Sequence, residues 1–255
     1  MNASRQRIDQ LLVARGFAAS RHKAQAMLLA GQVLVDEQKI DKPGRMVDSQ
    51  AAIRILGAMP FVSRAGGKLQ AALDHFQVEV AGRVCADLGA STGGFTDCLL
   101  QRGASVVHAY DVGEGQLAWK LRSDPRVVLH ERCNVRYLQA GDLPGEISVV
   151  TADLAFISLT KVLPPLGRAL RERPAQEVRS VDLLVLVKPQ FEVGKGEVGK
   201  GGIVRDPAKQ QGALAAVEQC AAASGYRVRG RLDSPIPGAR GNLEFFLHLQ
   251  LLPEL

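Results

Sequence analysis

Two charged residues stand directly behind apolar segments of the chain. Asp153 follows an apolar run at residues 147–152, and Lys188 follows a second run at residues 183–187. Such runs are typical of strands in a parallel sheet covered on both faces, and these sheets bind ligands at the carboxyl ends of their strands. Because lysine is seldom buried, Lys188 is either a reactive group at such an edge or a solvated strand end.

A glycine-rich segment, DLGASTGGF at residues 87–95, overlaps the end of a third predicted strand and leads into a helix. Glycines at such a turn let a ligand approach the backbone closely. Asp111 lies 24 residues after Asp87, at the end of the next predicted strand, where an acid can accept hydrogen bonds from ribose hydroxyls. Ser91 stands at the middle glycine of the dinucleotide fingerprint, and Asp87 suits a cationic methionine group. The segment therefore favours S-adenosylmethionine over a dinucleotide.

The elements that must position these groups alternate along the chain. A helix is predicted to open at residues 63–68, with apolar residues at helical spacing at Leu69, Ala72, Leu73 and Phe76. Strands are predicted at residues 83–88 and 105–112 and at the two apolar runs. This alternation predicts an α/β domain of the doubly wound, Rossmann-like class.

The first 57 residues have a different composition. They hold nine Lys and Arg against five acids, so they carry +4 of the chain's net charge of +6. Two short helices are predicted, one ending at Gly16 and one capped by Ser20, followed by a strand at residues 32–35. The second helix opens on Arg21, His22 and Lys23, where the helix dipole disfavours cations, and this favours an anionic ligand over a solvated basic surface.

Residues 5–50 resemble the S4-type RNA-binding domain, a small α+β module, and this implies an RNA partner. The expected organisation is an S4-type domain over residues 1–57, a linker at 58–62, and a catalytic domain over 63–255. The expected RNA contacts in the first domain are basic residues: Arg5, Arg7, Arg15, Arg21, His22 and Lys23.

Six segments follow the first module in the order SRAGGKL, DLGASTGGFTD, AYDVG, TADLAFISL, LVKPQFE and GNLEFF. In this order they resemble the TlyA family, also labelled haemolysin A, which comprises S-adenosylmethionine-dependent ribosomal RNA 2′-O-methyltransferases. The catalytic domain of that family is similar to the class I FtsJ/RrmJ ribose methyltransferases. The resemblance covers nearly the whole chain and implies methylation of cytidines in 16S and 23S ribosomal RNA.

The resemblance also assigns site residues. It places a catalytic tetrad on Lys68, Asp153, Lys188 and Glu244, and contacts to S-adenosyl-L-methionine on Asp87, Gly89, Ser91, Gly93, Gly94 and Asp111. The chain departs from the family at the linker, where Met59-Pro60-Phe61-Val62 stands in place of an Arg-Ala-Trp-Val segment of some members. The coupling between cofactor and RNA binding through this linker therefore stays open.

The chemistry of ribose methylation suits these residue types. A ribose hydroxyl is a poor nucleophile, so the enzyme must align the reacting atoms and remove a proton. A neutral Lys188 amine could accept that proton, with Asp153 and Glu244 holding the lysines and the substrate in position.

A glycine-rich loop, PQFEVGKGEVGKGGIVRDP, follows Lys188. Loops of this length are usually functional or disordered, and a lid that faces RNA and orders on binding is one interpretation, with a flexible crossover as the other. The lid would contact RNA through Lys195, Lys200 and Arg205, and Phe191 and Arg205 could stack on a flipped nucleotide.

Other function classes fit the sequence less well. No apolar window approaches the ~18 residues of a membrane span, and the amino terminus lacks the apolar core of a secretory signal. Four scattered cysteines suggest free thiols in a reducing cytoplasm and no metal site, and we expect a cytoplasmic monomer. The alternatives are an RNA-binding assembly factor without catalysis and, less favoured, a membrane-active haemolysin.

Overall fold

The computed structural model describes residues 5–29, 31–56, 60–173, 180–194 and 196–252. The chain divides into two compact units, Met1–Met59 and Pro60–Leu255, and each is described by itself.

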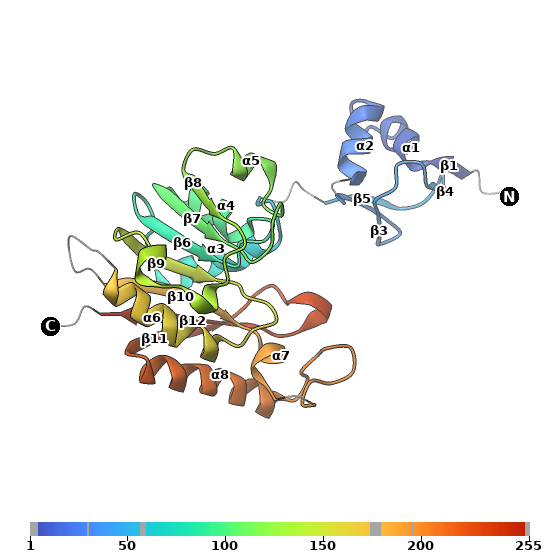
Figure 1. The fold of residues 1–255 in the computed structure, drawn as a ribbon. Helices are drawn as coiled ribbons and strands as arrows, with labels where there is room; N and C mark the ends of the chain where they lie inside the picture. The colour runs from blue at the N-terminus through green and yellow to red at the C-terminus, as the bar shows by residue number, and fades with distance from the viewer. Residues whose placement is uncertain (1–4, 30, 57–59, 174–179, 195, 253–255) are drawn as a thin grey trace. The chain divides into compact units, whose positions relative to one another are not determined.

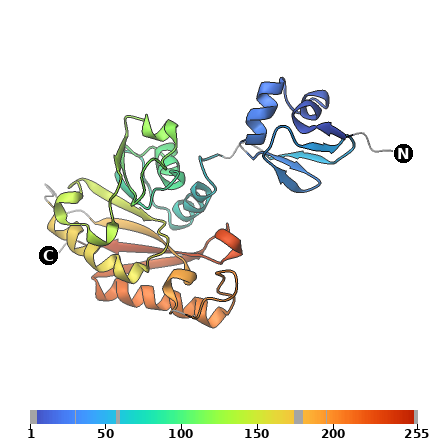
Figure 2. The same cartoon turned by 45° about the vertical axis from the view of Figure 1, so that its right-hand side comes forward.

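Unit 1 is a small α+β module (Figures 1 and 2). Its elements, in chain order, are β1 (Arg5–Arg7), α1 (Ile8–Ala14), α2 (Arg21–Leu29), β2 (Val33–Val35), β3 (Gln38–Ile40), β4 (Met46–Asp48) and β5 (Ile53–Ile55). β1 pairs antiparallel with β4, and β2 lies between β3 and β5 in a second antiparallel sheet. The two helices predicted from sequence are both present, and they pack through Ile8, Leu12 and Leu28 against these short strands.

Unit 2 is built on a seven-stranded sheet in the order β11-β12-β10-β9-β6-β7-β8. The strands are β6 (Val84–Leu88), β7 (Val106–Tyr110), β8 (Val127–His130), β9 (Ile147–Ala152), β10 (Val181–Val187), β11 (Tyr226–Asp233) and β12 (Phe245–Leu251). The pairs β8-β7, β7-β6, β6-β9 and β9-β10 are parallel, while β12 is antiparallel to both of its neighbours. The expected doubly wound α/β fold is confirmed.

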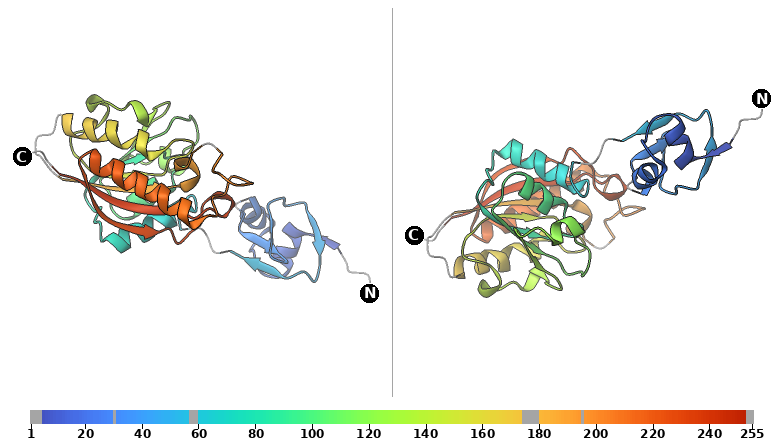
Figure 3. Two further views of the ribbon diagram at one scale, coloured as in Figure 1. Left: turned by 90° about the horizontal axis from the view of Figure 1, so that it is seen from below. Right: turned by 90° about the horizontal axis from the view of Figure 1, so that it is seen from above.

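Helices cover both faces of this sheet. Seen from above, α3 (Ala65–Phe76) and α4 (Gly94–Gln101) lie over one face, and seen from below, α6 (Leu163–Glu172) and α8 (Pro207–Ala223) lie over the other (Figure 3). Two short helices, α5 (Trp119–Arg122) and α7 (Pro189–Glu192), follow β7 and β10, and 3₁₀ turns occupy Val135–Tyr137, Ala140–Asp142, Leu159–Lys161 and Ala239–Gly241. Each face has its own apolar core, because β9 and β10 send side chains alternately to both sides.

The topology fixes where a ligand can bind. The chain passes from β6 to β7 on one side and from β9 to β10 on the other, so the strand order reverses between β6 and β9. In open parallel sheets, ligands bind at this switch point, beyond the carboxyl ends of the strands.

Candidate functional site

Strand register brings the predicted residues to one edge of the sheet. Leu88 of β6 pairs with Ala152 of β9, so Gly89 and Asp153 are the next residues beyond these two strands. Val187 of β10 pairs with Phe245 of β12, so Lys188 and Glu244 meet at the same edge. Gly89, Asp153, Lys188 and Glu244 therefore lie at the ends of apolar strands, on the edge of the sheet that contains the switch point.

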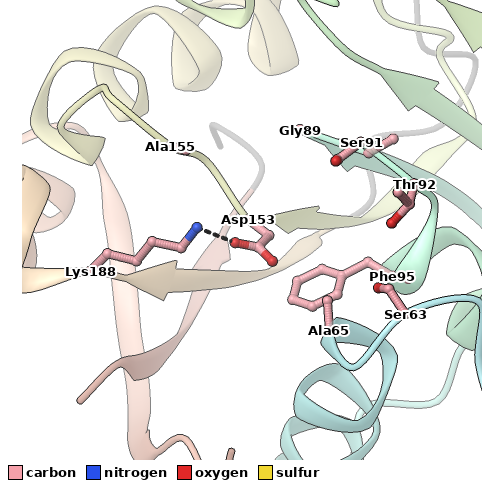
Figure 4. Close-up of a pocket in the computed structure, with 11 residues that line it drawn as sticks. Ser63, Ala65, Gly89, Ser91, Thr92, Phe95, Asp153, Ala155 and Lys188 are labelled. Carbon is pink, nitrogen blue, oxygen red and sulfur yellow. Dashed lines mark ion pairs between the residues drawn. The ribbon is translucent and has the colours of Figure 1, made fainter. Parts of the chain in front are cut away.

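Lys188 and Asp153 form an ion pair at this edge. Lys188 Nζ lies 2.5 Å from Asp153 Oδ1, and both side chains are more than four-fifths buried (Figure 4). Lys188 Nζ also lies 5.9 Å from the centre of the Phe191 ring. A lysine held in this way is not a solvated strand end, because its ammonium group is fixed by a partner and directed at the cavity that both residues line.

Lys68 and Glu244 form a second ion pair. Lys68 Nζ, in the first turns of α3, lies 2.6 Å from Glu244 Oε2, and the side chains are 10 % and 2 % exposed. The structure therefore arranges the four predicted tetrad residues as two buried lysine–carboxylate pairs. Buried pairs of this kind cost free energy to desolvate, which argues that they serve more than stability.

The glycine-rich turn packs directly against Asp153. Gly89 has a φ of +84°, and a Cβ at this position would lie 2.7 Å from the Asp153 carbonyl oxygen. At Gly93, with a φ of +96°, a Cβ would lie 2.2 Å from Leu121 Cδ1, and at Gly94 it would lie 2.2 Å from Ser63 Oγ. The positive φ favours glycine at Gly89 and Gly93, and at Gly89 the nearest neighbour is a backbone atom that cannot rotate away.

Asp111 fixes the other side of the turn. Its Oδ2 accepts a hydrogen bond of 2.7 Å from the Ser91 amide, and its Oδ1 accepts one of 2.7 Å from the Gly113 amide. Ser91 itself has a φ of +48°, which serine rarely adopts. The carboxylate still faces the larger of two adjoining cavities.

Asp87 lies beneath the turn. Its carboxylate is fully buried and accepts hydrogen bonds from Thr96 Oγ1 at 2.7 Å and Thr151 Oγ1 at 3.0 Å. Burial raises the pKa of Asp87 to about 6, the two threonine hydrogen bonds lower it, and the nearby charge of Asp153 adds to the rise. Among the described residues that line the two cavities, Asp87 is absent, so its carboxylate organises the turn from below.

The two cavities meet at the strand ends. A cavity of about 250 Å³ lies over Lys188, Asp153 and Phe95, and one of about 930 Å³ extends past Asp111. Both are lined by Gly89, Ser91, Asp153 and Ala155. The larger volume suits a nucleoside-sized ligand, and Asp111 on its wall suits the ribose hydroxyls of S-adenosylmethionine. No group of three or more His, Cys, Asp and Glu residues in the described part of the chain could hold a metal ion.

Two aromatic side chains line the larger cavity, and only one of them, Phe191, was identified from the sequence. Phe156 is 93 % exposed with a φ of +63°, and its ring centre lies 5.3 Å from that of Phe191. Both residues line the cavity. Phe191 was expected to stack on a nucleotide, whereas Phe156 sits in the TADLAFISL segment and carries no signal of its own without the fold.

A carboxylate joins the two loops that carry this pair. Glu192 accepts hydrogen bonds from Ser158 Oγ at 2.5 Å and from the Leu159 amide at 2.9 Å. Burial raises the pKa of Glu192, while these two hydrogen bonds lower it. The bonds tie α7, directly after Lys188, to the loop that follows Asp153. Sequence reasoning missed this link, because its partners lie 34 and 33 positions apart.

The glycine-rich loop after α7 is folded against the segment that carries Glu244. Asn242 donates to the Gly202 carbonyl at 2.9 Å and accepts from the Val204 amide at 3.1 Å. Lys200 and Arg205 are exposed on this loop, and Lys195 lies outside the described residues. This part of the loop therefore has defined hydrogen bonds to Asn242, and a lid that faces RNA stays a prediction, with a flexible crossover as the alternative.

The first residues of unit 2 also pack onto it. Phe61 is buried, the Val62 amide donates to Asp97 Oδ2 at 2.8 Å, and Gln101 donates to the Pro60 carbonyl at 2.8 Å. Of the linker expected at residues 58–62, positions 58 and 59 lie outside the described residues.

The predicted RNA contacts of unit 1 separate into three groups. Arg15 donates to the carbonyl oxygens of Ala51, at 2.7 Å, and Ser49, so its guanidinium holds the module together. The side chains of Arg7 and Arg21 contact Asp9, while Arg5, His22 and Lys23 are exposed.

Comparisons with known proteins agree with this geometry. The model of FtsJ-like methyltransferases matches residues 61–251, and the S4 domain model matches residues 6–53. The chain is 47 % identical to the 16S/23S rRNA (cytidine-2′-O)-methyltransferase TlyA of Mycobacterium tuberculosis, over 97 % of this chain and 91 % of that protein.

Two further relatives carry a different name. Hemolysin A of Brachyspira hyodysenteriae is 39 % identical, over 95 % of this chain and 98 % of that protein. A solved structure from Streptococcus thermophilus, described as a candidate hemolysin, is 39 % identical with a TM-score of 0.74, over 98 % of this chain and 90 % of that one. No helix in the described ranges is long and apolar enough to cross a membrane.

Proposed function

Because the chain belongs to the TlyA family of FtsJ-like methyltransferases, with an S4 domain ahead of the catalytic unit, we propose that it methylates ribosomal RNA. The reaction transfers a methyl group from S-adenosylmethionine to a ribose 2′-hydroxyl, and the substrate is a cytidine of 16S or 23S ribosomal RNA, as the name of the 47 % identical relative states for that protein. Action on ribosomal subunits would take place in the cytoplasm.

The ion pair of Lys188 and Asp153 carries this proposal. It stands at the wall of a cavity whose other side is the Gly89–Ser91 turn, so a methyl donor held by the turn would face Lys188. S-adenosylmethionine, when bound, supplies a methyl group on a positively charged sulfur, which needs little further activation for transfer. Gly89, Ser91 and Asp111 would hold it, through close backbone approach and a carboxylate on the cavity wall.

Residues of the chain then orient the ribose 2′-hydroxyl and remove its proton. To act as the base, the Lys188 ammonium first releases a proton to solvent. The neutral Nζ then accepts the proton of the 2′-hydroxyl as the oxygen takes the methyl group, and Asp153 stabilises the ammonium that forms again. Asp153 also fixes where Nζ lies, so that little ordering is needed at the moment of reaction. The pair Lys68–Glu244 adds a second fixed cation and anion at the same end of the sheet, suited to orienting the ribose and its phosphate.

Phe156 and Phe191 suit the base of the target nucleotide. A ribose inside a folded RNA becomes accessible only when its nucleotide leaves the stack, and exposed aromatic rings compensate the lost stacking by about 1–3 kcal/mol per base. Phe156 is free to do so, since nearly all of its side chain is exposed beside the cavity.

The function is tested by methyl transfer to ribosomal subunits that lack the modification. We expect the protein to label 16S or 23S ribosomal RNA with methyl groups from S-adenosylmethionine, and mapping to place them on ribose 2′-oxygens of cytidines. K188M should lower single-turnover transfer by about 10²–10⁴, the usual contribution of a general base, with S-adenosylmethionine binding retained. K209M, which removes a partly buried lysine of α8 that pairs with Glu197, is the matched control and should react normally.

The outcomes separate the competing functions. Methyl groups on a base would overturn the ribose assignment. Tight binding to ribosomal RNA with no methyl transfer, and no binding of S-adenosylmethionine in calorimetry, would favour an assembly factor without catalysis. Full turnover by folded K188M would remove Lys188 from the reaction.

A further inference from the structure

A buried carboxylate lies under the basic surface of unit 1. Asp9, in the first turn of α1, is completely buried and accepts four hydrogen bonds. Arg7 donates from Nε at 3.1 Å and from Nη2 at 3.0 Å, Arg21 donates from Nε at 2.9 Å, and Gln25 donates from Nε2 at 3.1 Å. The hydrogen bond from Arg7 is the main reason that the pKa of Asp9 lies well below its usual range, so the group stays ionised at any physiological pH.

The two guanidinium groups reach Asp9 from different elements and keep donors for another partner. Arg7 ends β1 and Arg21 begins α2, so one carboxylate connects them across 14 positions of sequence. Their side chains remain 40 % and 52 % exposed. The hydrogen bonds to Asp9 use neither Arg7 Nη1 nor the two Nη groups of Arg21, so both side chains keep N–H donors for another partner.

We propose that Asp9 is a positioning residue that holds Arg7 and Arg21 as one cradle for a phosphate group of the RNA backbone. This proposal rests on the proposed RNA substrate, of which Arg7 and Arg21 would bind one phosphate group. Guanidinium groups recognise phosphate through parallel N–H donors, which gives geometric specificity that a point charge lacks. Fixing two long side chains in advance removes the entropy cost of ordering them at the moment of binding.

Burial of the carboxylate makes this arrangement favourable for an anion. An exposed acid between two arginines would repel phosphate, whereas Asp9 is covered by the groups it orients and the cluster keeps a net charge of +1. The same module offers a contrast. Arg54 forms an ion pair with Glu37, whose side chain is 70 % exposed, so that arginine stands beside an acid that a phosphate would also meet.

The substitution Asp9→Asn separates orientation from charge. D9N makes unit 1 more positive by one unit, so simple electrostatic attraction predicts tighter binding to 16S or 23S ribosomal RNA. The cradle predicts the opposite, namely at least fivefold weaker binding at 150 mM KCl. The plot of log affinity against log salt should also be shallower by about 0.7–0.9, the loss of one phosphate contact. Titrations contain no S-adenosylmethionine, so they do not depend on methyl transfer.

Glu37→Gln is the matched control. It also removes a carboxylate paired with arginine in unit 1 and adds the same unit of charge, but that carboxylate is exposed and holds a single arginine. E37Q should bind ribosomal RNA as tightly as the wild type or more tightly. If D9N and E37Q, both folded by circular dichroism, bind equally well, the cradle is wrong.

A second pair of variants covers the case in which D9N unfolds unit 1. R7K and R21K keep the charge and the exposed position but remove the planar fork, so each should weaken binding about threefold or more while unit 1 stays folded by circular dichroism. Wild-type affinity in both would overturn the proposal. If the wild type itself fails to bind ribosomal RNA, the proposed substrate is wrong, which is a different result from equal binding by all variants.

Discussion

Asp87 shows how one residue of the site works against the stability of the fold. Its carboxyl group is fully buried near Asp153, so burial and a like charge favour its neutral form and raise its pKa to about 6. The hydrogen bonds from Thr96 and Thr151 offset only part of this cost. Because burying this carboxylate beneath the glycine-rich turn costs free energy, we infer that Asp87 shapes the turn for its ligand.

Asp87→Asn should change how stability depends on pH. A carboxyl group whose pKa is raised on folding binds more protons in the folded state, so its contribution is present below the unfolded pKa near 3.9 and is lost as pH rises through about 6. Between pH 4.5 and pH 7.5, the wild type should therefore lose about 2 kcal/mol of unfolding free energy relative to D87N. Urea unfolding at several pH values measures this difference, in which the contributions of acids that do not interact with Asp87 cancel.

The same variant tests whether Asp87 shapes the glycine-rich turn for S-adenosylmethionine. D87N keeps the size and polarity of the side chain, so the fold should persist while S-adenosylmethionine binding weakens. A constant stability difference across the pH range would contradict the raised pKa. Unchanged cofactor affinity would show that the charge beneath the turn is dispensable.

Among the elements, the strand ends were the most predictable part of the site. Asp153 and Lys188 could be assigned to a sheet edge because each follows an apolar run, and parallel strands end at a common edge. The pairing of Lys68 with Glu244 could not be derived from pattern, since the two lie 176 positions apart and taken singly resemble surface charges. The exposed Phe156 and the Ser158–Glu192 link depend on how two loops pack, which no periodicity reports.

The close approach between the turn and β9 predicts a large effect of Gly89→Ala. Its Cβ would lie 2.7 Å from the Asp153 carbonyl oxygen, which must move and shift the partner of Lys188 with it. We expect a loss of about 3 kcal/mol in unfolding free energy and at least tenfold weaker binding of S-adenosylmethionine. Chemical denaturation and calorimetry measure the two effects.

Gly82→Ala is the matched control for backbone strain. Gly82 also has a positive φ, +72°, but a Cβ there meets nothing within 4 Å. G82A should lose only about 1–2 kcal/mol, the cost of a left-handed residue, and should bind the methyl donor normally. Equal losses in G82A and G89A would mean that strain alone, and not the contact with Asp153, explains the glycine.

At the scale of the whole molecule, the structure divides the positive charge into different uses. The sequence placed +4 on residues 1–57 and could name the basic residues, but it could not tell which of them face a ligand. Arg15 bonds to two backbone carbonyls, Arg54 pairs with Glu37, and Lys23 stays exposed at the start of α2. Similar residues in one short module therefore differ in their partners and in their exposure.

This division predicts opposite outcomes for Arg15→Gln and Lys23→Gln, which remove the same charge from the same module. R15Q should lower the stability of unit 1 by about 1 kcal/mol, because hydrogen bonds to Ser49 and Ala51 are lost, and should leave the salt dependence of ribosomal RNA binding unchanged. K23Q should leave thermal unfolding unchanged and reduce the salt slope by about 0.7–0.9, since an exposed cation released one counterion. RNA titrations between 50 and 200 mM KCl, with thermal unfolding of the same samples, measure both. If the two variants reduce the salt slope equally, the basic module acts through its total charge, and the division of labour among its arginines is wrong.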